Sequence, residues 1–207
     1  MADLTLYTNP MSRGRIARWA MEEIGQPYET VLLEFGTTIK APDYLNVNPM
    51  GKVPTLTHGQ TVVTECAAIC AYLADAFPDA GLAPPVGGDL RGSYYRWLFY
   101  GAGPVEAAVT NHAMGFDTAG KEQQMGYGAF DHVMNTLEGA VKDREFLVGD
   151  SFTMADLYVG SQISWGLGFG TMDNRPGFKE YVARLTARPA AMRANELDDA
   201  AMPQTAG

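Results

Sequence analysis

Cysteine and histidine are scarce in this sequence, and the shortage limits the chemistry that the chain can supply by itself. The 207 residues include 2 cysteines and 3 histidines. Cys66 and Cys70 lie four positions apart, which is not the pattern of a disulfide framework, and two thiols without neighbouring histidines are too few for a zinc site. We therefore expect no bound metal, and thiol chemistry has to use one of these cysteines or a thiol from outside the chain.

Long apolar runs and an excess of basic residues are also missing. The chain has no uninterrupted run of about 18 apolar residues, the length that a membrane-spanning helix needs. Its first residues lack the basic segment and apolar stretch of a secretion signal. The 15 Lys and Arg against 24 Asp and Glu give a formal net charge of −9, the wrong sign for binding a phosphate backbone or an anionic bilayer. We expect a cytoplasmic protein that binds neither nucleic acid nor membrane.

Apolar sequence is abundant enough for a core, since 46% of the residues are hydrophobic. Over the first part of the chain, short runs of strand formers alternate with stretches of helical periodicity, and Gly or Pro separates them. The predicted elements, in order, are a strand at 4–7, a helix at 16–24, a strand at 28–33, a hairpin at 55–63 and a helix at 65–74. This order predicts an α/β unit over residues 1–77.

The rest of the chain shows no strand pattern. Residues 78–88 hold three prolines and three glycines, a composition typical of a linker between domains. Beyond the linker we predict an all-helical bundle over residues 89–190, with helices at 89–115, 119–142, 153–168 and 176–187. The remaining residues, 191–207, are small, acidic and polar, and we expect a loosely held tail there.

The turn after the first strand is the first candidate for chemistry. It places Ser12 in the first turn of the following helix, where unpaired backbone N–H groups and the helix dipole favour negative charge. A hydroxyl that donates a hydrogen bond to a thiolate lowers the pKa of the thiol, so Ser12 is suited to activate one. Serine is also a common N-cap residue, and the turn alone leaves this structural role open.

Two further stretches offer groups for a peptide-like ligand. Pro54 stands at the entry to a strand, either as an ordinary edge-strand start or as a cis-proline that exposes the preceding backbone for pairing. Glu65 and Cys66 open a helix whose free N–H groups suit a carboxylate, and Glu65 can pair with an amine. Lys52 can meet a second carboxylate. Taken singly, a residue such as Lys52 is most often a solvated surface charge, and one such as Glu65 is most often a first-turn acid matched to the helix dipole.

A fourth motif lies in the helical half, over residues 146–156. Thr153 and Asp156 are three apart, which predicts a capping box at a helix start, with Asp in place of the usual Glu or Gln. We therefore assign Asp156 a structural role.

In this order and spacing, the motifs resemble the cytosolic glutathione S-transferase superfamily, in its bacterial type with a serine in the active turn. The resemblance covers the chain to about residue 190. It implies a thioredoxin-like α/β domain over 1–77, a linker over 78–88 and an all-α helical-bundle domain over 89–190, followed by the tail. The motifs that carry it are residues 6–12, 48–56, 64–73 and 146–156.

The resemblance also implies a role for each candidate residue. The backbone of Val53 would pair with the cysteinyl part of glutathione, beside a cis Pro54. Glu65 and Cys66 would hold the γ-glutamyl end at the helix start, and Lys52 would face the glycyl carboxylate. The sulfur would then point at the turn, with Ser12 as the catalytic donor to the thiolate.

Alternatives remain at two of these positions. Alignment on Arg13 and Arg15 resembles the Tyr-type classes instead, so that Asn9 takes the place of their tyrosine and the arginines supply charge. Cys66 stands where the family usually has serine, so a weak donor replaces a good one, although the backbone N–H of Cys66 still serves. At a helix start this thiol is either reactive or, the commoner case, buried and inert.

The implied function is glutathione transfer to hydrophobic electrophiles, with glutathione as co-substrate. An apolar, Met-rich set suits the electrophile pocket, and we expect two or three of its six members to face the ligand. The six are Met11, Tyr94, Trp97, Met114, Phe116 and Trp165. Two other functions remain: a glutathione-dependent reductase of disulfides or peroxides, and a non-catalytic glutathione-binding module. The family resemblance also implies a homodimer.

Overall fold

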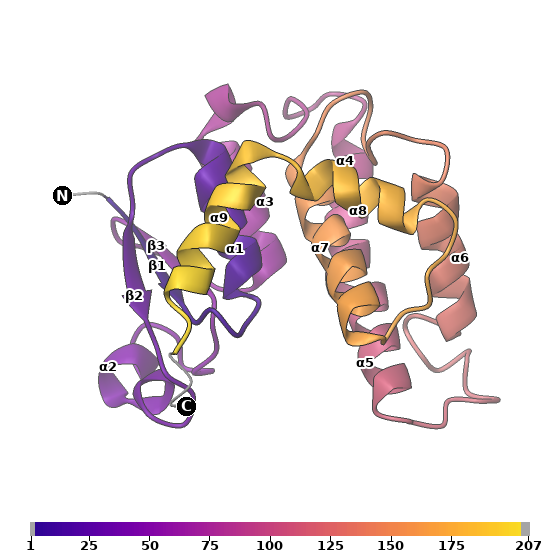
Figure 1. The fold of residues 1–207 in the computed structure, drawn as a ribbon, viewed down its shortest axis with the longest axis horizontal. Coiled ribbons are helices and arrows are strands. Elements are labelled where there is room, and N and C mark those ends of the chain that lie inside the picture. Colours follow the sequence, from indigo (N-terminus) through magenta and orange to yellow (C-terminus); the bar gives the residue numbers. More distant parts are fainter. Residues whose placement is uncertain (1–2, 204–207) are drawn as a thin grey trace. The chain divides into compact units, whose positions relative to one another are not determined.

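A computed structural model describes residues 3–203 and divides the chain into two compact units. Unit 1 consists of residues 1–80 together with 188–207, and unit 2 of residues 81–187 (Figure 1). Unit 1 carries the strands, and the described residues of unit 2 form helices and loops without a strand. This confirms the predicted fold class, an α/β unit followed by an all-α unit.

The sheet of unit 1 has four short strands in the order β2-β1-β3-β4. The central strand β1 runs parallel to β2 and antiparallel to β3, and β3 forms a hairpin with β4. Leu6 of β1 and its partner Leu56 of β3 are fully buried, so the middle of the sheet belongs to the core. The strands are β1 (Leu4–Thr8), β2 (Glu29–Leu32), β3 (Thr55–His58) and β4 (Thr61–Val63).

Helices α1 (Gly14–Ile24) and α3 (Cys66–Ala76) pack against each other beside the sheet. In α1 the residues with helical periodicity are those that are buried, and the helix ends at Gly25, whose φ of 64° suits a residue without a Cβ. Shorter turns complete the unit: η1 (Thr38–Lys40), α2 (Pro42–Leu45) and η2 (Pro78–Ala80).

The end of the chain differs from the expected loose tail over 191–207. Residues Pro189–Ala200 form helix α9, which packs on α1 within unit 1 (Figure 1). Ion pairs attach it to α1. Arg18 pairs with the buried Asp198 at 2.7 Å, and Arg188 makes two bonds of 2.7 Å to Glu23. The face of α9 turned toward α1 carries alanines and a charge rather than large apolar residues, so hydrophobic periodicity does not reveal it.

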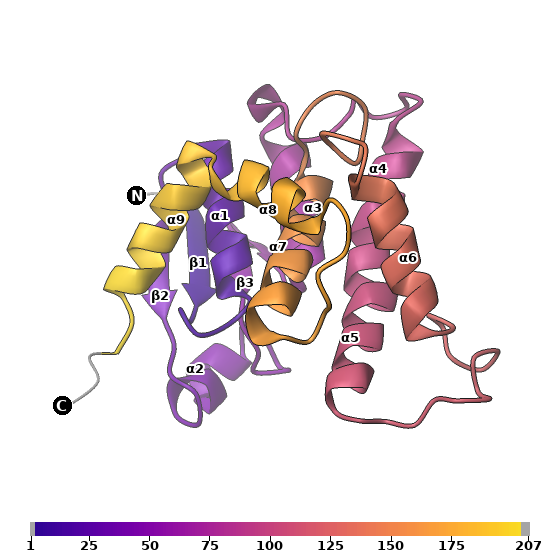
Figure 2. The same ribbon diagram turned by 45° about the vertical axis from the view of Figure 1, so that its right-hand side comes forward.

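Unit 2 consists of five α-helices and one π-helical turn among its described residues. The predicted helix at 89–115 is present as α4, a π turn at Gly101–Val105 that contains Pro104, and α5, in succession (Figure 2). The helix predicted over 119–142 begins only at Phe130, because Gly120 and Gly128 adopt positive φ in the preceding loop. The helices are α4 (Arg91–Tyr100), η3 (Gly101–Val105), α5 (Glu106–Ala113), α6 (Phe130–Val141), α7 (Met154–Phe169) and α8 (Phe178–Thr186).

The capping box predicted at Thr153 and Asp156 is present at the start of α7. Asp156 is fully buried, and each of its carboxylate oxygens accepts two hydrogen bonds. One oxygen accepts from the Leu147 N–H and the Tyr181 hydroxyl, both at 2.7 Å; the other accepts from the N–H of Thr153 at 2.9 Å and its hydroxyl at 3.0 Å. Asp156 therefore joins the loop before α7, the start of α7 and α8.

Among the described residues, no helix is long and apolar enough to span a membrane. Within residues 3–203 we also find no group of three His, Cys, Asp or Glu side chains placed to hold a metal ion.

Candidate functional site

The turn between β1 and α1 is held in shape by Asn9. The side chain is 6% exposed, its amide Nδ2 donates to the Leu33 carbonyl at 2.6 Å, and its Oδ1 accepts from the Met11 N–H at 2.8 Å. One of these bonds reaches the segment after β2, and the other closes the turn. In this structure Asn9 therefore positions the chain between Pro10 and Gly14.

Ser12 lies at the end of this turn and is half-buried. Its hydroxyl donates to the Asn9 carbonyl at 2.7 Å and accepts from the Gly14 N–H at 2.9 Å. A serine hydroxyl has a single proton, so donation to a ligand requires it to leave the Asn9 carbonyl. That carbonyl also accepts from the Ser12 N–H at 3.1 Å, and it keeps this partner when the hydroxyl turns away. Because the Asn9 carbonyl keeps one hydrogen bond, the free-energy cost of reorienting the Ser12 hydroxyl is low.

Arg15 is engaged in the structure of unit 1. Its Nε donates to the Pro10 carbonyl and its Nη2 to Asp199 of α9, each at 2.6 Å. The side chain of Arg13 is exposed, while its backbone carbonyl accepts from the Cys66 thiol at 3.7 Å. Arg15 therefore links the turn to the C-terminal helix, and Arg13 contributes its backbone to the contact with α3.

The entry to β3 presents an open stretch of backbone. The Val53–Pro54 peptide bond is cis, as the family resemblance implies. Within the described residues, neither the N–H nor the C=O of Val53 makes a hydrogen bond. Val53 is half-buried, Pro54 is buried, and the neighbouring Lys52 side chain is exposed. One donor and one acceptor of the main chain are therefore available to an extended ligand.

Two buried polar residues hold this stretch in place. The Tyr44 hydroxyl and the Asn48 amide both donate to the Lys52 carbonyl, the latter at 2.9 Å. Both side chains also contact the Thr55 hydroxyl, at 2.8 and 3.1 Å. Burial raises the pKa of Tyr44, so its hydroxyl stays protonated and can donate. The peptide before Val53 is thereby fixed from the protein side.

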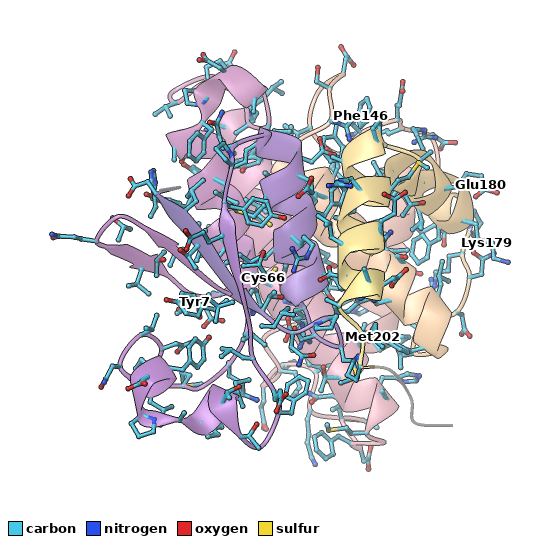
Figure 3. The ribbon with its side chains drawn as sticks, turned by 60° about the vertical axis from the view of Figure 1, so that its left-hand side comes forward. Tyr7, Cys66, Phe146, Lys179, Glu180 and Met202 are labelled. Carbon is cyan, nitrogen blue, oxygen red and sulfur yellow. The ribbon has the colours of Figure 1, made fainter. Side chains whose placement is uncertain are left out.

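The start of α3 offers backbone donors. No side chain caps this helix, and the N–H groups of Ala67 and Ala68 have no acceptor within the described residues. Glu65 stands just before the helix with a φ of 64°, a conformation that side-chain-bearing residues rarely adopt, and its side chain is exposed. Cys66, labelled in Figure 3, is only 7% exposed. The helix start thus presents N–H groups and a carboxylate, with the thiol turned inward.

The six residues predicted for an apolar pocket differ in exposure. Tyr94 and Trp97 are 0% and 4% exposed and belong to the core of unit 2, so they offer a ligand little surface. Met114 and Phe116 in unit 2 are 65% and 58% exposed, Met11 in unit 1 is 55% exposed, and Trp165 is half-buried. Met11, Met114, Phe116 and Trp165 are therefore the four candidates for the two or three residues that we expect to face the ligand.

Sequence reasoning missed residues whose hydrogen bonds hold the backbone and side chains of the site in place. Tyr44 and Asn48 hold the Lys52 carbonyl, and Asp199 holds Arg15. Asn48 lies within a motif that the sequence singled out, but Tyr44 and Asp199 carry no local signal because their partners are 8 and 184 positions away.

Comparisons with known proteins agree with this architecture. The family model described as "Glutathione S-transferase, N-terminal domain" matches residues 2–75, and "Glutathione S-transferase, C-terminal domain" matches residues 104–189. A relative named glutathione S-transferase GstA, from Escherichia coli O157:H7, is 31% identical over 151 residues, which cover 71% of this chain and 74% of the relative.

Solved structures are similar over nearly the whole chain. A glutathione transferase from Methylococcus capsulatus is 27% identical with a TM-score of 0.78, and the match covers 95% of this chain and 99% of that one. A sphingomonad glutathione S-transferase, described as complexed with glutathione, is 26% identical with a TM-score of 0.77, covering 94% and 98% of the two chains.

Proposed function

The chain belongs to the glutathione S-transferase family, and we propose that it binds glutathione in unit 1 and directs the thiol at small hydrophobic electrophiles. The proposal for the individual residues starts from Val53. Its free N–H and C=O can pair with the main chain of the cysteinyl residue of glutathione, as one strand pairs with another. This open backbone, held by Tyr44 and Asn48, is the observation that carries the assignment.

The two ends of glutathione find complementary charge on either side of Val53. The glycyl carboxylate is assigned to the exposed ammonium of Lys52. The γ-glutamyl carboxylate is assigned to the N–H groups at the start of α3, where the helix dipole adds to their attraction, and the γ-glutamyl amine to Glu65. Cys66 contributes its backbone at this point, because its side chain is buried.

We assign thiolate stabilisation to Ser12. The alternatives are Asn9, Arg13 and Arg15. Asn9 and Arg15 are both engaged in holding the turn. Arg13 contributes its backbone carbonyl to the contact with Cys66, and its side chain is exposed. The Ser12 hydroxyl can exchange its bond to the Asn9 carbonyl for a bond to sulfur, since the carbonyl keeps the Ser12 N–H. A free thiol with a pKa of about 8.5 is mostly protonated near neutral pH, so a lowered pKa directly increases the fraction of reactive thiolate.

Binding of a non-reactive analogue tests the site without turnover. Lys52→Ala is expected to weaken S-hexylglutathione by about tenfold, because one charge-assisted hydrogen bond contributes about 1.5–3 kcal/mol and each 1.4 kcal/mol is a factor of about ten. Lys121→Ala removes an exposed Lys of unit 2 and serves as the matched control. Equal affinities in the two variants, measured by isothermal titration, would contradict the assignment.

Product identification separates transfer from the two other functions. A thioether formed from glutathione and a hydrophobic electrophile supports the proposal. Glutathione disulfide as the main product assigns the same thiolate to reduction of disulfides or peroxides. Binding of S-hexylglutathione without turnover over a broad electrophile panel assigns the chain to a non-catalytic binding role.

We further propose, from family membership, that two copies of the chain form a homodimer. Tyr95 and Phe99 project from α4 with exposures of 38% and 71%, an apolar surface of the kind that subunit interfaces bury. Sedimentation equilibrium of the full chain tests this. A cytoplasmic location, without nucleic acid or membrane partners, stays a prediction from the sequence.

A further inference from the structure

Thr8 carries a buried hydroxyl that makes no hydrogen bond. The residue follows Tyr7 (labelled in Figure 3) at the end of β1 and is 0% exposed. Its Oγ1 has no hydrogen-bond partner within the described residues. Buried polar groups are nearly always paired, and an unpaired one costs free energy. A valine of the same shape would fill this place without that cost, so the hydroxyl needs an explanation other than packing.

The sheet fixes the position of this hydroxyl. Thr8 pairs with Leu32 of β2, and its carbonyl accepts from the Leu33 N–H at 2.9 Å. The side chain lies against the start of α1, because a Cβ added to Gly14 would be 1.9 Å from Thr8 Oγ1. The φ of Gly14 is not positive. It is therefore the close approach of Thr8, and not the backbone conformation, that requires a glycine at this position.

The hydroxyl of Ser12 lies at the same place. Its Oγ is 2.9 Å from the position of the same added Cβ. Both hydroxyl oxygens thus lie around the one position that the missing Cβ of Gly14 leaves vacant, without a hydrogen bond between them. A side chain at Gly14 would separate the two groups.

The two hydroxyls have complementary hydrogen-bonding capacity. The Ser12 oxygen accepts from the Gly14 N–H at 2.9 Å, and its proton goes to the Asn9 carbonyl at 2.7 Å. A hydroxyl oxygen can accept two hydrogen bonds, so one lone pair of Ser12 is open. Thr8 has a proton without an acceptor. Rotation of the Ser12 side chain away from the Asn9 carbonyl changes the direction of the open lone pair, and a small shift suffices to meet Thr8.

We propose that Thr8 is a positioning residue for Ser12: when Ser12 donates its proton to the sulfur of glutathione, the Thr8 hydroxyl donates to the Ser12 oxygen. This role rests on the proposed function and adds a second hydroxyl to it. Every proton stays on its own oxygen, so only hydrogen bonds change. Hydrogen bonds in such a chain polarise and strengthen one another, which makes Ser12 a better donor to the thiolate. The Thr8 hydroxyl also gains the acceptor that it lacks in this structure.

Thr8→Val removes the hydroxyl and keeps the shape of the side chain. The pH at which bound glutathione ionises, read from the ultraviolet absorption of the thiolate, should rise by about 0.5–1 pKa unit, the equivalent of one neutral hydrogen bond that forms only with the thiolate. Thr8→Ser keeps the hydroxyl and should ionise bound glutathione as the parent chain does. Thr5→Val makes the same replacement at a half-buried position earlier in β1, and it should also leave the ionisation unchanged.

Three further measurements separate positioning from a structural role. In the Ser12→Ala chain, Thr8→Val should cause no additional shift, because Thr8 acts through the Ser12 oxygen. The free energy of unfolding, from urea denaturation, should be unchanged or higher in Thr8→Val, since a buried hydroxyl without a partner is removed. S-hexylglutathione has no free thiol and should bind to Thr8→Val as it binds to the parent chain.

Four results overturn this role for Thr8: an unchanged ionisation in Thr8→Val, a shift in Thr8→Ser as large as in Thr8→Val, the same rise with and without Ser12, or a rise accompanied by lower stability and weaker S-hexylglutathione binding. A bound thiol that ionises in the parent chain as it does in water, or as it does in Ser12→Ala, overturns the proposed role of Ser12 together with it. A lowered value in the parent chain that Thr8→Val leaves in place overturns the role of Thr8 alone.

Discussion

The replacement Asp156→Asn tests how unit 2 is held together. Both carboxylate oxygens of Asp156 accept two hydrogen bonds, and all four donors belong to the protein. An asparagine has nearly the same shape but only one oxygen, so its NH₂ group faces one backbone N–H and one hydroxyl in either orientation. The hydroxyl can turn and accept from the NH₂ group, but the backbone N–H cannot. No rotation of the amide restores the network.

The size of the effect follows from this count. One buried backbone N–H loses its acceptor, and an unsatisfied buried group costs about 1–3 kcal/mol, so the free energy of unfolding should fall by about 1–3 kcal/mol. That is a sizeable share of the roughly 5–15 kcal/mol that stabilises a typical domain. The variant is therefore expected to unfold at a lower urea concentration than the parent chain.

Urea denaturation followed by circular dichroism measures this change, with Asp150→Asn as the control. Asp150 lies in the same loop but is exposed, and its replacement should change the free energy of unfolding by less than about 0.5 kcal/mol. The reasoning is refuted if Asp156→Asn stays within about 1 kcal/mol of the parent chain, or if both variants lose the same amount.

Two further predictions concern unit 1. A Cβ on Gly14 would lie 1.9 Å from the Thr8 hydroxyl. Gly14→Ala should therefore destabilise the fold by about 1–3 kcal/mol and weaken S-hexylglutathione binding. The additional replacement Thr8→Ala should recover part of both losses, and no recovery would place the strain elsewhere. Burial raises the pKa of Asp198 above its ordinary 3.8, so the folded state binds its proton more tightly than the unfolded state, and this contribution to stability is lost as pH rises. The stability of the parent chain relative to Asp198→Asn should therefore be greater at about pH 4 than at about pH 7 in parallel urea titrations, and a difference that grows with pH would contradict this sign.

The parts of the fold that follow from the sequence are those whose pattern is local. Ile16, Ala20 and Ile24 recur at helical spacing, Gly25 ends their helix, and the structure buries these apolar residues. The capping box of α7 was also readable, because its two members are three positions apart. Such signals depend on near neighbours in the chain, and the sequence displays them completely.

Helix α9 was missed because what attaches it to α1 is polar and distant in sequence. Its buried positions are Ala191, Ala194 and Asp198, which resemble the composition of a solvated tail. The buried Asp198 accepts a hydrogen bond from Arg18, which lies 180 positions earlier. No local pattern predicts that pairing.

The candidate site likewise combines residues that local motifs predict with contacts that no local motif predicts. Ser12, Lys52, Val53 and Glu65 could be named from motifs, but the sequence could not show which groups are already occupied. The structure provides this, because Asn9 and Arg15 are engaged in the turn while the backbone of Val53 is open.

The pH at which bound glutathione ionises tests the central claim most directly. The ultraviolet absorption of the thiolate, recorded for the complex without electrophile, gives this pH for the parent chain and for Ser12→Ala. We expect an ionisation well below the free thiol value of about 8.5 in the parent chain. In Ser12→Ala it should rise by about one to two pKa units, the equivalent of a lost hydrogen bond to a charged sulfur, with glutathione affinity within a few-fold. An unchanged ionisation in Ser12→Ala would contradict the role of Ser12, and a bound thiol that ionises as it does in water would contradict the account as a whole.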